Sequence, residues 1–201
     1  MRHAFLLALL FVVATPVGAA DTAVGKPGEV RTAIFAGGCF WCIEADFEKL
    51  PGVVAVESGY TAGRTLNPTY EQVSSGSTGH TEAVRVSYDA RRISYVQLLD
   101  FFWRHIDPTV RNRQFCDVGS QYRSGIYWQD DFERKAAHGS RDALLASGKL
   151  PRIETEIAAA SVFYPAEEYH QDYYRKNAVR YSYYRLSCGR DARIRQIWGD
   201  G

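Results

Sequence analysis

The sequence is poor in methionine and has no long apolar run beyond its first residues. Met1 is the single methionine among 201 residues, a weak indication of a protein that works among oxidants, since methionine is readily oxidised. Basic residues (24) nearly balance acidic ones (23), so charge gives no argument for binding nucleic acid or an anionic membrane surface. The chain contains no repeats and no low-complexity stretch. Its length predicts one domain, covering residues 30–201 with a C-terminal tail.

The first 20 residues predict a signal peptide. A short basic start precedes an apolar run at 4–14, which is too short to span a bilayer, and small residues at 18–20 suit cleavage. No cysteine follows the run to carry a lipid. We expect an exported, periplasmic protein with no stable membrane insertion after cleavage and a flexible lead-in at 21–29. A buried N-terminal helix and an uncleaved anchor are the alternatives.

Hydrophobic periodicity predicts an α+β fold of two layers. The apolar or alternating segments predict strands at 30–36, 53–60, 82–88, 124–128 and 153–159. The segments of helical period, with their cap residues, predict helices from 39 to 50, from 94 to 106, from 130 to 145 and from 165 to 180. Long irregular stretches at 61–79 and 107–121 are the expected functional loops. The order of the strands cannot be derived from these patterns.

The four cysteines allow either structural disulfides or thiol chemistry. In an oxidising compartment the even number first suggests two disulfides, but a chain of this length does not need them to fold. Residues 39–42 (CFWC) have the spacing of a redox pair. Cys39 follows two glycines and precedes a predicted helix, so we expect it at a helix N-terminus, where its pKa would be lowered. Two buried, inert thiols are the alternative.

Three further residues could supply polar groups to such a site. Glu82 ends the GHTE segment at the start of a strand; if it were buried, its pKa would rise and it could donate a proton near neutral pH. Tyr70 and Tyr122 lie in or beside the long loops, where their hydroxyls could hold a polar oxygen. Taken singly, each of the three is more often a solvated or packing residue.

Five short motifs, in order, resemble those of the A-type peptide methionine sulfoxide reductases. They are GCFW at 38–41, NPTY at 67–70, GHTE at 79–82, DVGSQYRS at 117–124 and YHQ at 169–171. The resemblance extends roughly from residue 31 to residue 188. It implies a two-layer α/β sandwich with a ferredoxin-like core.

The resemblance assigns a role to seven residues. It implies that Cys39 is the nucleophile, that Glu82 protonates the sulfoxide oxygen, and that Tyr70 and Tyr122 hold that oxygen. Asp117 would belong to the same polar site, and Phe40 and Trp41 would receive the substrate methyl group.

The implied reaction is the reduction of the S epimer of methionine sulfoxide, free or protein-bound, in the repair of oxidised proteins. Cys39 would become a sulfenic acid, a second thiol would form a disulfide with it, and a thioredoxin-like reductant would recycle the enzyme. No metal and no organic cofactor is needed. We expect a monomer.

The identity of the second thiol is open. Cys188 fits the C-terminal position used by many family members, although this tail lacks their glycine-rich stretch. Cys42 could close a disulfide directly, and Cys116 adds a third thiol beside Asp117. We favour Cys188 slightly over Cys42.

Three other classes of protein fit these residues less well. His80 and Glu82 have the H-x-E form of zinc deaminases, but the CxxC pair precedes that motif instead of following it. A disulfide-stabilised binding module would leave no reactive thiol. A general thiol–disulfide oxidoreductase would use Cys39 and Cys42 but would not account for the tyrosine and glutamate motifs.

Overall fold

The computed structural model describes residues 29–199 and contains a six-stranded mixed sheet. The predicted signal peptide and nearly all of the predicted lead-in lie outside the described residues. The sheet has the order β7-β6-β1-β3-β2-β8. Its strands are β1 (Val30–Gly37), β2 (Val53–Thr61), β3 (Thr81–Asp89), β6 (Ser124–Trp128), β7 (Glu156–Ala159) and β8 (Tyr164–Pro165).

The four central strands confirm the ferredoxin-like core. β1, β2, β3 and β6 alternate in sequence with two helices, α1 (Phe40–Phe47) and α3 (Tyr95–Arg104), and lie in the order β6-β1-β3-β2. Each neighbouring pair among them is antiparallel, whereas β7 joins β6 in parallel. Because β3 inserts between β1 and β2, the first strand–helix–strand unit is a crossover, as predicted.

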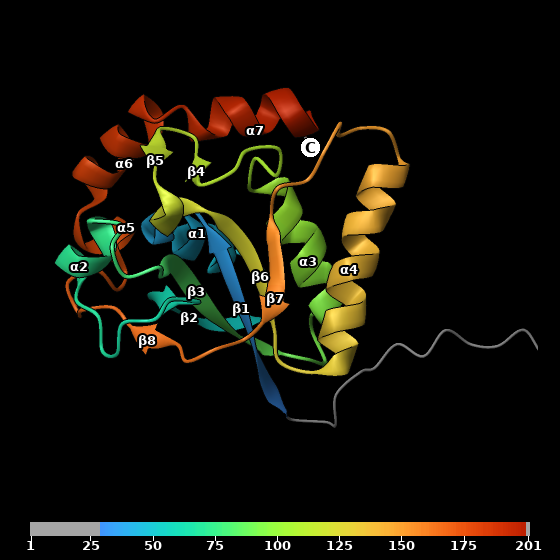
Figure 1. The fold of residues 1–201 in the computed structure, drawn as a ribbon, viewed down its shortest axis with the longest axis horizontal. Coiled ribbons are helices and arrows are strands. Elements are labelled where there is room, and N and C mark those ends of the chain that lie inside the picture. The colour runs from blue at the N-terminus through green and yellow to red at the C-terminus, as the bar shows by residue number, and fades with distance from the viewer. Residues whose placement is uncertain (1–28, 200–201) are drawn as a thin grey trace, which may run out of the picture.

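Both crossover helices pack on one face of this sheet. Phe35 of β1 stacks on Phe47 of α1 and on Phe102 of α3, so a single aromatic cluster joins the two layers. Ser94 caps α3 through a capping box with Gln97, as its sequence predicts. The long helix α4 (Asp131–Ala146) packs against α3 and the β6–β7 edge (Figure 1). On the opposite face a smaller apolar cluster includes alanines and Phe163 from the segment 158–163.

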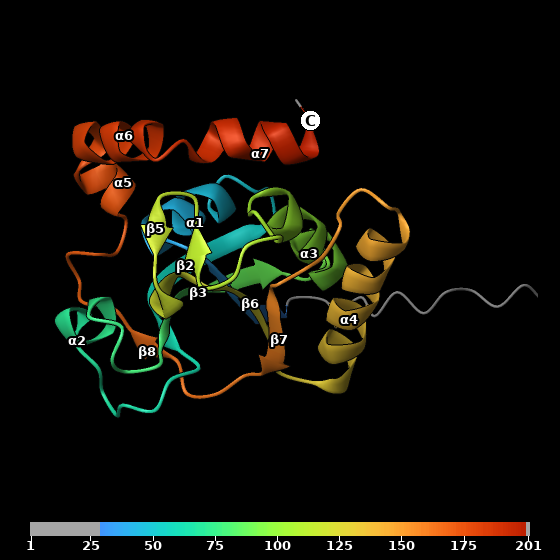
Figure 2. The ribbon, with the colours of Figure 1, turned by 45° about the horizontal axis from the view of Figure 1, so that its top comes forward.

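The C-terminal segment differs most from its prediction. The helix expected at 165–180 is instead the short strand β8, a turn, and the helices α5 (Tyr173–Lys176) and α6 (Ala178–Ser187). The predicted tail contains a further helix, α7 (Arg190–Trp198). Figure 2 shows α6 and α7 lying across α1 on its side away from the sheet.

Charged contacts attach this outer layer to α1. Asp46, buried on α1, pairs with Arg185 of α6 at 2.8 Å, and Arg190 of α7 lies beside it. The Arg190 side chain is itself buried and donates to the carbonyl oxygens of Gly37 and His105 at 3.0 and 2.8 Å.

The long irregular stretches contain short elements. The first includes α2 (Tyr70–Ser74), and the second includes the two-stranded hairpin of β4 (Arg113–Gln114) and β5 (Asp117–Val118), followed by the 3-10 helix η1 (Ser120–Tyr122). Within residues 29–199, every helix is too short or too polar to cross a membrane.

Candidate active site

A small cavity of about 80 Å³ opens at the N-terminal end of α1. It is smaller than a typical drug-sized pocket of roughly 300–1,000 Å³ and suits the end of one side chain. All seven predicted site residues line it, together with one residue that was not predicted. The lining residues are Cys39, Phe40, Trp41, Tyr70, Glu82, Asp117, Tyr122 and Tyr184. These residues come from the start of α1 and from α2, β3, β5, η1 and α6, so six elements meet at one point.

Backbone geometry places Cys39 at the start of α1. It is the N-cap residue, as the sequence predicted, and its carbonyl oxygen accepts the N–H of Cys42 at 3.1 Å. The preceding Gly38 has φ +83°, and a Cβ there would lie 2.5 Å from the Cβ of Gln114. Only glycine fits this position without strain. The Gly-Cys pair thus brings the thiol and the β4 segment together.

The electrostatic environment of Cys39 differs from the prediction. Burial raises the pKa of the Cys39 thiol well above its usual value, and hydrogen bonding to Cys42 and the negative charges of Glu82 and Asp117 add to the effect. The expected lowering at a helix N-terminus is therefore wrong, because desolvation penalises the thiolate. Cys39 holds its proton at neutral pH until a ligand changes its surroundings.

Cys42 lies one turn further along α1 and is also a free, buried thiol. The hydrogen bond with Cys39 lowers the pKa of Cys42, and the positive charges of Arg190 and Arg185 lower it further. Cys42 is thus the easier of the two thiols to ionise.

Glu82 is the buried acid of the cavity. It lies at the start of β3, is 2% exposed, and its Oε2 accepts the backbone N–H of Phe40 at 2.9 Å. Burial raises the pKa of Glu82 to about 8, despite that hydrogen bond. The carboxyl group is therefore protonated at neutral pH, with Oε1 free to carry the proton.

Two tyrosines from different loops complete the polar side. Tyr70 is the first residue of α2, and its N–H donates to Glu167 Oε1 at 2.8 Å. Tyr122 ends η1, which Thr81 holds against β3 by donating to the carbonyl oxygens of residues 121 and 123. Burial raises the pKa of Tyr70 to about 12 and raises that of Tyr122 also. Both hydroxyls remain protonated and able to donate.

Trp41 is fixed on the apolar side by two aromatic partners. Its indole stacks on Tyr173 at 3.7 Å between ring centroids, and its Nε1–H donates to His170 Nδ1 at 3.0 Å. His170 also lies against the rings of Phe40 and Tyr70. The YHQ motif therefore supports the cavity wall from outside, a positioning role that the sequence analysis did not assign.

Tyr184 on α6 is the lining residue that sequence reasoning missed. Its hydroxyl donates to Asp117 Oδ2 at 2.5 Å, and its ring meets Trp41 edge-on at 6.1 Å. Burial raises the pKa of Asp117, while the Tyr184 hydrogen bond and the charge of Arg190 oppose the rise. The position of Tyr184 in the supposed tail, among 13 tyrosines, gave no signal.

The remaining cysteines form a disulfide outside the cavity. Cys116, next to Asp117, is joined to Cys188 at the C-cap of α6. Cys188, favoured as the second thiol, is therefore not free in this structure, and Cys42 is the thiol that the fold brings to Cys39.

The zinc-deaminase alternative finds no support in this geometry. Among residues 29–199, the cluster of three side chains with metal-ligating atoms is Cys116, Asp117 and Cys188, and its sulfurs are bonded to each other. His80 is hydrogen-bonded to Gly63 and Thr65 instead of facing a metal with the CxxC pair.

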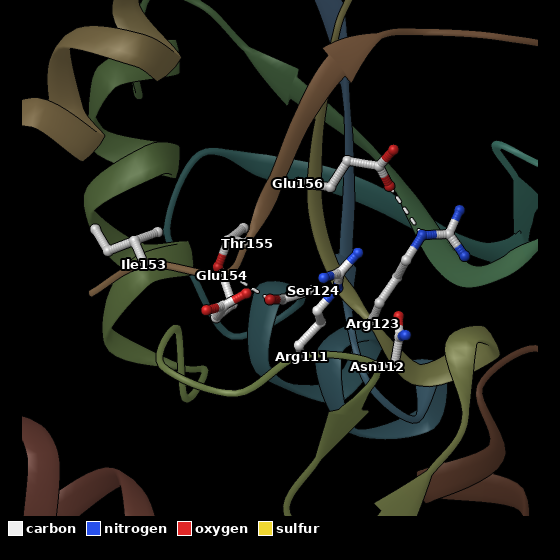
Figure 3. A pocket seen from close by; sticks show the side chains of 8 residues that line it. All are labelled: Arg111, Asn112, Arg123, Ser124, Ile153, Glu154, Thr155 and Glu156. Atoms are coloured by element: carbon white, nitrogen blue, oxygen red, sulfur yellow. Dashed lines mark hydrogen bonds and ion pairs between the residues drawn. The ribbon is translucent and has the colours of Figure 1, made fainter. Parts of the chain in front are cut away.

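A larger cavity of about 360 Å³ lies beside β6 and β7 (Figure 3). Arg123 and Glu156 form an ion pair at 2.8 Å there, and none of its eight lining residues is a cysteine or a histidine. It contains no thiol, so the small cavity at α1 is the candidate active site.

Comparison with known proteins gives the same family throughout. The family model described as peptide methionine sulfoxide reductase matches residues 31–201. Peptide methionine sulfoxide reductase MsrA 2 of Caulobacter vibrioides is 47% identical, over 96% of this chain and 98% of its own, and MsrA of Bacillus pumilus is 49% identical, over 84% and 95%. Mxr1 from Saccharomyces cerevisiae in reduced form has a TM-score of 0.71 and 34% identity, covering 76% of this chain and 88% of its own. With the fold and the cavity in agreement, the chain belongs to the peptide methionine sulfoxide reductase family.

Proposed function

We propose that this protein reduces the S epimer of methionine sulfoxide in peptides, with Cys39 as the nucleophile. One observation carries the proposal: a buried thiol, a protonated carboxyl group and two tyrosine hydroxyls line the same small cavity, closed on one side by aromatic rings. A methionine sulfoxide has a polar oxygen and an apolar methyl group on the same sulfur. Its binding site therefore needs hydrogen-bonding groups on one side and an apolar surface on the other.

The chemistry follows from the protonation states. Before substrate enters, Glu82 and Cys39 both hold their protons. A bound sulfoxide places its partly positive sulfur at Cys39 and its oxygen at Glu82, Tyr70 and Tyr122. Proton transfer from Glu82 to that oxygen makes the sulfur electrophilic, and the positive charge that develops there stabilises the thiolate of Cys39 as it attacks.

The products balance without any further reactant. The oxygen leaves the sulfoxide sulfur and becomes the hydroxyl group of a sulfenic acid on Cys39. Methionine sulfoxide is thereby reduced by two electrons to methionine, and Cys39 is oxidised by two. The proton released by the Cys39 thiol restores Glu82. No metal or organic cofactor takes part in these steps.

We assign the second thiol to Cys42 in preference to Cys188. Cys42 is a free thiol one turn from Cys39, and its pKa is lowered, whereas Cys188 is bonded to Cys116. Attack of Cys42 on the sulfenic acid expels water and forms a Cys39–Cys42 disulfide. A thioredoxin-like dithiol then reduces this disulfide and restores both thiols.

Export to the periplasm, with removal of the first 20 residues, and a monomeric state are part of the proposal. Export rests on the basic start, the apolar run and the small residues at 18–20.

The first test is turnover of each epimer of a methionine sulfoxide peptide with excess dithiol. Methionine release from the S epimer alone, abolished by Cys39→Ser, is the expected result, because that variant lacks the nucleophile. Tyr183→Phe, a change at an exposed residue of α6, is the control and retains full activity. No release from either epimer by folded protein would contradict the proposal.

A further inference from the structure

The β4–β5 hairpin carries Asp117 into the cavity but cannot hold it there unaided. Each strand has two residues, and an isolated hairpin of that size is not stable in water. Its connection contains Phe115 at φ +53°, a left-handed conformation that a bulky side chain adopts only when its surroundings enforce it. Arg190 contributes one restraint, with its guanidinium 4.6 Å from the centre of the Phe115 ring.

Helix α6 supplies two further ties to the same hairpin. Cys116 is bonded to Cys188, and the next hairpin residue, Asp117, accepts the hydroxyl proton of Tyr184 at 2.5 Å. The two helix residues are one turn apart, and the N–H of Cys188 donates to the carbonyl oxygen of Tyr184 at 2.9 Å. Neighbouring residues of the hairpin are thus attached to neighbouring turns of one helix, which Figures 1 and 2 show beside β5.

The two ties differ in chemistry and in exposure. The hydrogen bond ends inside the cavity, where Tyr184 and Asp117 are both lining residues. The disulfide lies outside it and Cys116 is exposed, so a dithiol in solution can reach it. Exchange with that dithiol leaves two thiols on this protein and a disulfide on the reductant.

We propose that Tyr184 is a positioning residue for the substrate site, acting through Asp117, and that the Cys116–Cys188 disulfide keeps the two in register. The proposal rests on the proposed function and extends it. The disulfide maintains substrate affinity by holding the hairpin in place, and it takes no part in the transfer of oxygen. Reducing it loosens the hairpin, so affinity for a peptide sulfoxide depends on the redox state of a bond outside the catalytic cycle.

Peptide binding to the protein carrying Cys39→Ser tests this without turnover. The dissociation constant of a methionine-S-sulfoxide peptide is measured by calorimetry, first with the disulfide intact and then after reduction by dithiothreitol. We expect reduction to weaken binding about 5-fold and Tyr184→Phe to weaken it about 10-fold, since a hydrogen bond to a charged group is lost. Reduction of the Tyr184→Phe protein should weaken binding no further, because both changes release the same hairpin.

Matched controls separate positioning from general destabilisation. Tyr183→Phe removes the hydroxyl of a neighbouring tyrosine that is 73% exposed and leaves binding unchanged. In a single turnover without added reductant, which keeps the outer disulfide bonded, Tyr184→Phe should raise the half-saturating peptide concentration (KM) about 10-fold and change the rate constant (kcat) less than about 2-fold, because the nucleophile and the acid are intact. A variant that merely unfolded would lose kcat in proportion to the folded fraction.

Three outcomes would overturn the inference. They are unchanged binding in Tyr184→Phe, additive effects of that substitution and reduction, and a loss of kcat with no change in KM. If the Cys39→Ser protein with its disulfide intact does not bind the peptide at all, the proposed function fails instead.

Discussion

The two pairs of cysteines differ in burial, and the difference separates a chemical role from a structural one. Cys39 and Cys42 lie one turn apart in a buried cluster and remain free thiols, whereas Cys116 and Cys188 are 72 residues apart, reach the surface and are bonded. The distant pair closes a long loop and can stabilise the fold. The adjacent pair closes almost no loop, so its value is chemical.

Burial also determines how Cys39 and the acid beside it titrate. Removal from water raises the pKa values of Cys39 and Glu82 together, so both protons are retained until substrate arrives. The outer pair does not titrate while it is bonded. Substitutions at the inner pair should therefore change the reaction, and substitutions at the outer pair should change affinity and stability.

The largest expected contrast is between Cys42→Ser and the double change Cys116→Ser with Cys188→Ser. Without Cys42, the reaction should stop after one methionine per protein when a thioredoxin-like protein is the reductant, because the sulfenic acid has no partner thiol. The double variant should continue to turn over. Methionine release and mass spectrometry with a sulfenic-acid trap measure both.

The trapped species decides this comparison. A Cys39 adduct in the Cys42→Ser protein and a Cys39–Cys42 disulfide in the double variant are expected. A sulfenic acid that accumulates only when Cys188 is missing would show that the C-terminal thiol is the partner.

The next effect concerns the buried acid. Glu82→Gln should lower kcat by roughly 10²–10⁴-fold, the usual contribution of a general acid. Because the pKa of Glu82 is raised to about 8, this carboxyl group carries its proton below that pH and loses the proton above it. The rate constant kcat/KM should therefore fall as pH rises through about 8, and a pH profile of the variant should lack this fall.

Glu133 provides the matched control for that substitution. It is equally buried and burial raises its pKa to about 7, but it lies on α4, outside the cavity. Glu133→Gln should keep both kcat and the alkaline limb of the profile. An alkaline limb that persists in Glu82→Gln would assign it to another group.

The sequence predicted what local pattern determines. The strand at 124–128 has its predicted bounds, Ser94 caps the predicted helix, and the seven residues inferred from motifs line one cavity. These features depend on periodicity, caps and short motifs, all of which are visible within a few residues.

The failures arise from contacts between distant segments. Pro165 and Glu167 look like a helix start, but Pro165 pairs with Gly59 of β2, and Glu167 accepts the Tyr60 hydroxyl and the Tyr70 N–H. The direction of the Cys39 pKa shift was wrong because a helix N-terminus is a local feature and desolvation is a tertiary one. Tyr184 was missed because its partner, Asp117, lies 67 residues away.

The smallest effect on turnover, and the clearest effect on stability, belongs to the outer pair. Replacing Cys116 and Cys188 by serine should lower the free energy of unfolding by roughly 2–4 kcal/mol, because an open chain gains conformational freedom when it unfolds. Thermal or urea unfolding of the oxidised wild-type protein and the double variant measures the difference. Dithiothreitol should bring the wild-type midpoint close to that of the variant and leave the variant itself unchanged. Equal midpoints for all four samples would contradict a stabilising disulfide and would leave Arg190 and Tyr184 as the restraints that hold the hairpin to α6 and α7.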